Sequence, residues 1–199
     1  MSLSTSMDAR SKTVYLAQVI GITSPIIYSS LTFAYSWLVV PPIVDHAPPK
    51  LLAKQWLQAY QAATGFVVPF VLSGTLANAA LGYLSKSRNT KILYGVAAVL
   101  TWSIMPVTIL YFEPNINGSA KWKVQKLLED EGYTMKENER LLPYVDRQTG
   151  KPEARRWAAT VDLKEIVTTW ARYNAWRGIA PAAAALLSIG ATSGLLDFI

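Results

Sequence analysis

The stretch VYLAQVIGITSPIIYSSLTFAYSWLVV, residues 14–40, contains no charged side chain, and residues 57–84, 92–112 and 178–196 share this property. An α-helix needs about 20 apolar residues to cross about 30 Å of hydrocarbon. Isolated strands of this composition would leave their backbone polar groups unpaired in lipid. The sequence therefore predicts an all-α integral membrane protein with one domain, residues 1–199. Its four-helix bundle is expected to span the membrane at residues 14–40, 57–84, 92–112 and 170–196.

The overall composition agrees with a membrane protein. Of the 199 residues, 51% are hydrophobic and only 16% are charged, which is unusual for a soluble domain of this length. The net charge of +6 comes from residues that flank the apolar stretches, so we expect contact with anionic lipid head groups and not with nucleic acid. Cysteine is absent and His46 is the single histidine, which excludes thiolate chemistry and a multi-histidine metal site.

The distribution of Lys and Arg predicts an orientation. Five basic residues lie in the N-terminal tail and the second connection, at positions 10, 12, 86, 88 and 91, against two at positions 50 and 54 in the first connection. The positive-inside rule then places both termini in the cytoplasm. Residues 41–56 and the long insertion 113–168 face the lumen or exterior, and an internal membrane such as the endoplasmic reticulum is expected. Asn117 begins a glycosylation sequence that lies too near the membrane for modification.

The connections differ in character. Two proline pairs in residues 41–49 are expected to prevent a continuous helix and to make 41–56 a stiff link. Within the insertion, residues 121–131 have the pattern of an amphipathic surface helix, and 143–152 that of a turn-rich linker. A helix from about Glu153 is expected to run into the fourth span. The first dozen residues are expected to form a tail without regular structure.

Polar and small residues share one face of each predicted helix. Such a face ordinarily serves close helix packing, and this interpretation competes with a ligand site. Each span also contains one proline, which predicts kinks and a cavity, although proline is common in membrane helices. The faces comprise Gln18, Gly21, Pro25, Tyr28, Thr32 and Tyr35; Gln61, Gly65 and Pro69; Thr101, Met105 and Thr108; and Trp170, Asn174, Arg177, Pro181, Ala184 and Ser188.

Arg177 stands at the start of the last uncharged stretch. A guanidinium keeps its proton, so near a bilayer it must reach head groups, pair with an anion or hold a ligand. The predicted topology brings it to the same side as the first connection and the end of the third span. We expect a ligand site there. Its polar groups are Arg177, Asn174, Thr108, Glu113, Asn115, Asp45, His46 and Tyr60.

Three spaced motifs in this region support a family resemblance. They are Gln55-Trp56-x3-Tyr60-x4-Gly65-x3-Pro69, Met105-Pro106-x-Thr108 followed by Pro114-Asn115, and Trp170-x3-Asn174-x2-Arg177-x3-Pro181. The chain resembles the small four-helix membrane family, once a domain of unknown function, that includes the fungal anthrone oxygenases. The resemblance implies a monooxygenase of secondary metabolism. It would oxidise a polyketide anthrone to an anthraquinone with O2, without flavin, haem or metal.

That chemistry suggests roles for the candidate residues. His46 is the expected base, with Asp45 or Glu113 as alternatives, and Arg177 with Asn174 would hold the developing oxyanion. The expected substrate-binding residues are Tyr60, Trp170, Tyr28, Thr108, Asn115 and Gln61.

Several alternatives remain open. His46 is equally an exposed loop residue, or a lone haem ligand. The main competing function is a non-enzymatic four-span scaffold or partner-binding protein, in which Arg177 pairs with Glu113 or Asp45. The absence of Asp, Glu and Lys from the spans disfavours proton-coupled transport. The expected partners are an aromatic polyketide and membrane lipid. A homo-oligomer is compatible with the oxygenase function and with the scaffold function.

Overall fold

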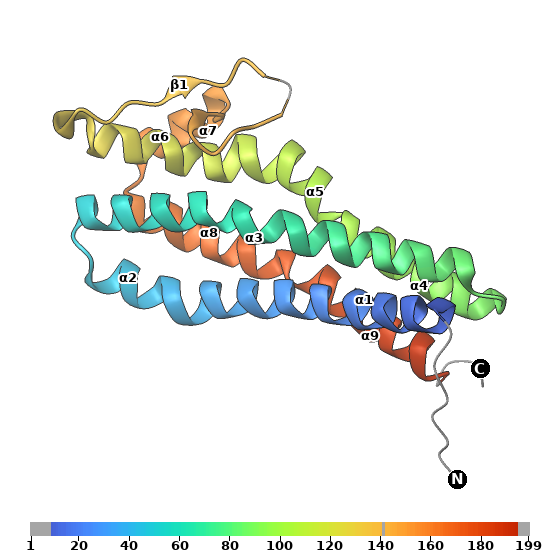
Figure 1. The fold of residues 1–199 in the computed structure, drawn as a ribbon. Helices are drawn as coiled ribbons and strands as arrows, with labels where there is room; N and C mark the ends of the chain where they lie inside the picture. The colour runs from blue at the N-terminus through green and yellow to red at the C-terminus, as the bar shows by residue number, and fades with distance from the viewer. Residues whose placement is uncertain (1–8, 141, 195–199) are drawn as a thin grey trace, which may run out of the picture.

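The computed structural model describes residues 9–140 and 142–194, and it confirms the all-α prediction. The only strands in these residues are β1 (Lys136–Glu137) and β2 (Arg147–Gln148), which pair in parallel. Figure 1 shows long helices lying side by side, with α6, α7 and β1 gathered at one end. Of the predicted N-terminal tail, residues 1–8 lie outside the described residues, and helix α1 already begins at Ala9.

The first helical rod is longer than predicted. It comprises α1 (Ala9–Ala34), a π-helical segment η1 (Tyr35–Val39) and α2 (Val40–His46), and only residues 47 and 48 separate it from α3 (Pro49–Leu84). The prediction that 41–56 forms a connection is therefore wrong. The prolines at 41 and 42 occupy the first turn of α2, where their missing N–H groups are tolerated after the wide π turn.

With α3 as the second rod, the third helical rod also continues beyond Phe112, where the third span was predicted to end. It comprises α4 (Arg88–Trp102), α5 (Ile104–Val107), η2 (Thr108–Asn117) and α6 (Gly118–Leu127). Pro114 does not end it, because η2 is π-helical and the N–H of Gly118 donates to the carbonyl of Glu113, five residues back. Residues 113–127 are thus an extension of the third helix and not a separate surface helix.

The remaining insertion contains η3 (Glu129–Glu131), the two short strands and α7 (Pro152–Thr160), followed by α8 (Leu163–Arg177) and α9 (Ile179–Ser193). The expected continuous helix from Glu153 is interrupted twice. Asp162 caps α8 by accepting a 2.8 Å hydrogen bond from the N–H of Glu165. At Gly178, which separates α8 from α9, the carbonyl accepts a 2.8 Å hydrogen bond from the Ser29 hydroxyl of α1. The last two residues of the predicted fourth span, 195 and 196, lie outside the described residues.

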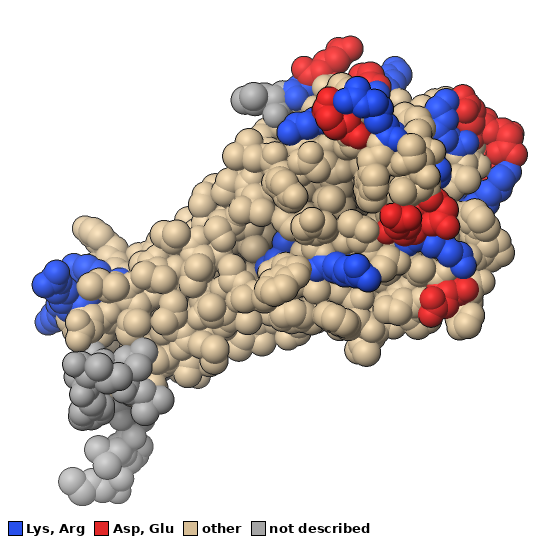
Figure 2. Space-filling model, turned by 180° about the vertical axis from the view of Figure 1, so that it is seen from behind, with Lys and Arg blue, Asp and Glu red and all other residues tan. Residues whose placement is uncertain are grey.

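Three helical stretches are long and apolar enough to cross a membrane: Ser11–His46, Pro49–Leu84 and Arg88–Leu127. At 1.5 Å per residue, the 36-residue rods are about 54 Å long, so each extends well beyond a hydrocarbon layer of about 30 Å. Figure 2 shows most charged residues gathered at one end, a small basic group at the other and little charge between them. This distribution indicates a membrane protein. The fourth span stays a prediction, although α9 packs against α1 and α4.

The largest apolar core lies at the charged end. It joins α2, the start of α3, α6 and the first half of α8, with Leu52, Ala53, Val124 and Ile166 fully buried. Below it the bundle has only small buried clusters, such as Tyr28, Val71 and Ile104. The molecule thus has a compact charged head on a thinner apolar bundle.

Polar side chains link the helices of the apolar bundle. Pro25 has no N–H for the carbonyl of Gly21, and this carbonyl instead accepts a 2.9 Å hydrogen bond from the Asn78 amide of α3. The Ser188 hydroxyl of α9 donates in turn to the Asn78 Oδ1 at 2.8 Å. The polar face of the first helix therefore does pack inward here, while the expected proline kinks stay a prediction.

Candidate functional site

A cavity of about 490 Å³ lies where the head meets the apolar bundle. Residues of α1, α3, η2, α8 and the segment 142–145 enclose it, and most of them are apolar. Its volume falls in the range of about 300–1,000 Å³ that is typical of small-molecule sites. Among the described residues, Glu113 and Arg177 are its only charged lining residues. The polar lining is completed by Tyr28, Thr32, Tyr35, Tyr60, Thr64, Thr108, Asn117, Trp170 and Asn174.

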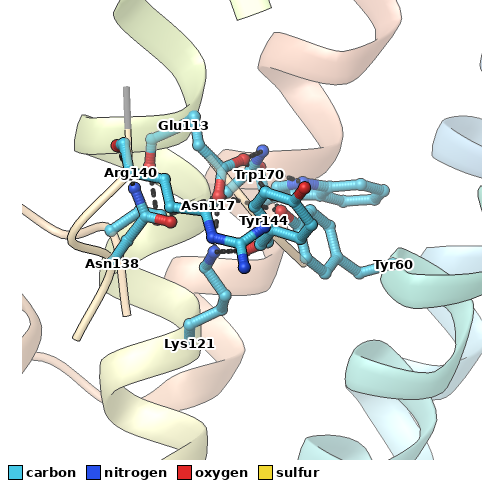
Figure 3. A network of polar contacts seen from close by, with 9 residues as sticks. Tyr60, Glu113, Asn117, Lys121, Asn138, Arg140, Tyr144 and Trp170 are labelled. Atoms are coloured by element: carbon cyan, nitrogen blue, oxygen red, sulfur yellow. Dashed lines mark hydrogen bonds and ion pairs between the residues drawn. The ribbon is translucent and has the colours of Figure 1, made fainter. Parts of the chain in front are cut away.

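Glu113 on η2 is buried and accepts hydrogen bonds from four side chains, three of which, those of Tyr60, Asn117 and Lys121, are labelled in Figure 3. The Tyr60 hydroxyl lies 2.9 and 2.8 Å from its two oxygens, and the Asn117 amide donates to Oε2 at 2.6 Å. The Thr149 hydroxyl and the Lys121 ammonium donate to Oε1 at 2.8 and 2.5 Å. A carboxylate offers about four acceptor sites, so this one is fully satisfied.

Lys121 has no exposed surface and forms an ion pair with Glu113. Its ammonium also donates to the carbonyl of Tyr144 at 3.2 Å. Taking two charges out of water is costly and is offset only where geometry and additional hydrogen bonds are favourable. Sequence reasoning missed Lys121 and Asn117. The signal was present in the four-residue spacing of 113, 117 and 121, which places these residues along one helical surface once the helix continues past Pro114.

Aromatic rings hold Tyr60 and Trp170 in place. Trp56 stacks on Tyr60 with ring centres 5.1 Å apart and planes at 7°. Trp170 meets Trp56 and Tyr35 edge to face, and its indole N–H donates to the Asn117 Oδ1 at 2.9 Å. Such ring pairs contribute beyond their buried area and fix ring orientation. The polar network and the aromatic cluster are therefore a single rigid unit.

Arg177 on α8 has a much poorer set of partners. Its Nη1 donates to the Asn174 Oδ1 at 3.3 Å, and its Nε is buried without a hydrogen-bond partner. No described carboxylate pairs with it. The guanidinium lies 5.3 Å from the centre of the Phe112 ring, a favourable cation–π distance. The Asn174 amide is held by a 2.9 Å hydrogen bond to Ser36 on η1. Arg177 is thus a positioned cation in an apolar cavity.

The structure brings most of the candidate residues together. The cavity lining includes Tyr28, Tyr60, Thr108, Glu113, Trp170, Asn174 and Arg177. Gln61 and Asn115 do not line it, and the Asn115 amide donates instead to the carbonyl of Tyr111.

Asp45 and His46 are not brought to the cavity either. Both are exposed at the end of α2, and the backbone carbonyl of Asp45 accepts a hydrogen bond from Lys164. Because α2 continues the first rod, His46 lies eleven residues beyond the cavity-lining Tyr35, about 16 Å along the helix axis. The expected convergence of His46 with Arg177 is therefore wrong.

The sequence also matches a known protein family. A family model described as anthrone oxygenase matches residues 56–187, more than half of the chain. The chain belongs to the anthrone oxygenase family. In this anthrone oxygenase family member, the matched stretch contains Tyr60, Glu113, Lys121 and Arg177, whereas His46 lies outside it. No curated protein and no solved structure matches the chain.

Proposed function

We propose that this protein oxidises an anthrone-type aromatic polyketide to the anthraquinone with O2, in fungal secondary metabolism and without flavin or metal. The observation that supports this most is the cavity itself. It is apolar enough for a flat aromatic molecule, and it combines a carboxylate on η2 with an unpaired guanidinium on α8. A reaction that removes a proton and generates an oxyanion needs these two groups.

The substrate's polar edge is proposed to face α8. An anthrone has a ketone opposite its reactive methylene, and loss of a methylene proton places negative charge on that ketone oxygen. Arg177 has a buried, unpartnered Nε and Asn174 lies beside it, so both are available to the oxyanion. Hydrogen bonds to a charged oxygen in a water-poor site are stronger than those in water. Trp170 and Tyr28 supply the flanking aromatic surface.

Proton removal is proposed to run through Tyr60 to Glu113. All acceptor sites of Glu113 are occupied, so the carboxylate does not reach the substrate directly. The Tyr60 hydroxyl lines the cavity and donates to both carboxylate oxygens. It accepts the methylene proton as it passes its own proton to Glu113. Glu113, one of the alternatives to His46, thereby takes the place of His46 as the base.

The remaining chemistry belongs to the substrate and oxygen. The enolate passes one electron to O2, and the substrate radical and superoxide combine to form a carbon–oxygen bond. Protonation gives a hydroperoxide at the former methylene. Loss of the second methylene proton with cleavage of the O–O bond forms the new ketone and releases water. One oxygen atom enters the product and one leaves as water, and the substrate methylene supplies all four electrons that reduce O2.

The protein is proposed to work in the endoplasmic reticulum or another internal membrane, with four spans and both termini in the cytoplasm. The exposed basic residues at the end opposite the head, Lys12, Lys86, Arg88 and Lys91, support this orientation. The head would then lie on the lumenal side. The cavity at its base lies near the depth where amphiphilic aromatic molecules concentrate.

Oxygen uptake by the purified protein in detergent tests the proposal. With 1,8-dihydroxyanthrone we expect uptake above the non-enzymatic rate, and Glu113→Gln is expected to lower kcat by about 10²–10⁴-fold. Because this variant leaves Lys121 unpaired, the double variant Glu113→Gln with Lys121→Met is measured too. Glu165→Gln, at an exposed position of α8, is the matched control. Absence of uptake by the unaltered protein would overturn the proposed function.

A further inference from the structure

A second hollow lies beside the apolar cavity and differs from it in chemistry. It has a volume of about 340 Å³ and a largely polar lining that includes Asn138, Gln148, Thr149 and Arg155. It reaches the surface at Glu137, whose side chain is 61% exposed. Hydrogen bonds from Arg155 hold the pKa of Glu137 below its ordinary value, so this rim stays charged. The hollow is therefore a polar depression that opens to solvent at the surface of the head.

The two hollows share a thin partition. Ile109, Glu113 and Pro143 line both of them, and Glu113 is the only titratable residue of the three. Tyr60 contacts Glu113 and lines the apolar cavity, whereas Thr149 contacts Glu113 and lines the polar hollow. The other side-chain partners, Asn117 and Lys121, do not line the hollow. Glu113 is thus hydrogen-bonded to one hydroxyl on each side.

We infer that Thr149 and the polar hollow form a proton route between Glu113 and water, which makes Thr149 a further functional residue. This inference rests on the proposed function and extends it. When Glu113 gains the substrate proton from Tyr60, the Thr149 oxygen accepts a hydrogen bond from it. Thr149 passes its own hydroxyl proton to water in the hollow and takes the proton of Glu113. The carboxylate is restored, the proton has left the cavity, and the negative charge of the enolate stays beside Arg177.

The apolar character of the cavity makes such a route useful. A proton held on Glu113 would return to the enolate carbon, because the mostly apolar lining of the cavity disfavours the water that would remove it. Release to the hollow separates the proton from the enolate while oxygen reacts. The same route returns one proton to the peroxide, so the overall reaction of the methylene with O2 still gives one ketone and one water. The proton balance therefore closes without any further reactant.

Hydrogen exchange without oxygen isolates this step. In D2O under anaerobic conditions, the unaltered protein should exchange the methylene hydrogens of 1,8-dihydroxyanthrone for deuterium faster than buffer alone, as followed by mass spectrometry. Thr149→Val keeps the side-chain shape but removes the hydroxyl, and we expect enzymatic exchange to fall by about tenfold or more. Substrate KM should change less than about twofold, because Thr149 does not line the apolar cavity.

Two further variants make the result decisive. Thr149→Ser retains a hydroxyl and should restore exchange, and Thr134→Val, at an exposed position of the insertion, should leave it unchanged. Exchange at the original rate in Thr149→Val, with oxygen uptake intact, overturns the proton route but leaves the proposed function standing. A protein that takes up no oxygen contradicts the proposed function and the route together. If Thr149→Val is poorly folded, exchange in Thr149→Ser that stays as low as in buffer overturns the route.

Discussion

The cavity has two charged walls that are built in opposite ways. The η2 wall, Glu113 and Asn117 with Lys121 behind them, is a closed network in which every charge has a partner. The α8 wall, Trp170, Asn174 and Arg177, presents a cation with one long hydrogen bond and a buried, unpartnered Nε. Both walls belong to helices at the same depth of the bundle.

The two walls therefore differ in how far the protein itself satisfies their charged groups. Glu113 has all its hydrogen-bond partners, whereas Arg177 does not. A buried charge with full hydrogen bonding is stable without a ligand, and it can cycle through proton transfer while its position stays fixed. A partly buried cation without an anion is costly, and its interaction energy becomes available when an anionic ligand or transition state arrives. We therefore expect changes on the η2 wall to affect folding first, and changes on the α8 wall to affect activity first.

The largest expected effect is loss of the η2 counterion. Lys121→Met leaves Glu113 as an unpaired buried carboxylate, and we expect the free energy of unfolding to fall by about 3–5 kcal/mol. Thermal or denaturant unfolding in detergent measures this. Lys126→Met is the matched control, because Lys126 pairs with Glu129 at an exposed site and should change stability by less than about 1 kcal/mol.

A rescue sharpens the interpretation. Adding Glu113→Gln to Lys121→Met removes both charges, and most of the lost stability should return while kcat stays about 10²–10⁴-fold below that of the unaltered protein. If Lys121→Met alone proves as stable as the unaltered protein, the ion pair is not the element that holds this wall together.

Arg177→Lys tests the role of the guanidinium in the α8 wall. An ammonium keeps the charge but loses the planar set of donors, so we expect kcat/KM to fall by about 10²-fold with little change in stability. Arg172→Lys, five residues earlier at an exposed position of α8, should retain full activity. This comparison also separates the oxygenase from the scaffold alternative. A guanidinium that only reaches head groups tolerates lysine, so full oxygen uptake in Arg177→Lys would contradict the oxyanion role.

The helical class, the three long apolar stretches and the inward faces follow from uncharged length and periodicity, and these were predictable. The ends of the first and third helical rods could not be predicted from the sequence. Under the rules for α-helices, Pro41 and Pro114 each predict the end of a helix. In the structure each lies at or within a π-helical turn, where the missing N–H is tolerated. Nothing in residue type distinguishes these two outcomes. The head, which consists largely of these helix extensions, could therefore not be predicted from the sequence.

The mispredicted helix ends also explain why some site residues were predicted correctly and others were not. Tyr60, Trp170, Asn174 and Arg177 lie on helix faces set by regular periodicity, and all four line the cavity. Lys121 was assigned to a surface helix because the third span was expected to end at Phe112. The misplacement of Asp45, His46 and Lys121 therefore follows from errors in two helix ends. Gln61 is a separate error, because it lies within the regular helix α3 and still does not line the cavity.

Asn174→Asp would give the Arg177 guanidinium of the α8 wall an anionic partner within the protein. The new carboxylate would stand beside the Arg177 guanidinium, which now meets only an amide oxygen at 3.3 Å. We expect stability to be retained or raised, and activity to fall by about tenfold because an internal anion competes with the oxyanion for the same donors. Steady-state oxygen uptake and thermal unfolding of one preparation test both parts. Higher activity in this variant would mean that Arg177 does not act on an anion.

The smallest expected effect concerns a residue outside both walls. His46→Ala should change kcat/KM by less than about twofold, because His46 is exposed at the end of α2 and does not line the cavity. Tyr60→Phe is the informative counterpart, since it removes only the hydroxyl that donates to Glu113. Its kcat should fall by about 10²-fold or more if the proton passes through Tyr60. A large loss in His46→Ala with full activity in Tyr60→Phe would move the base out of the cavity to α2, and would require the first rod to bend at η1 during catalysis.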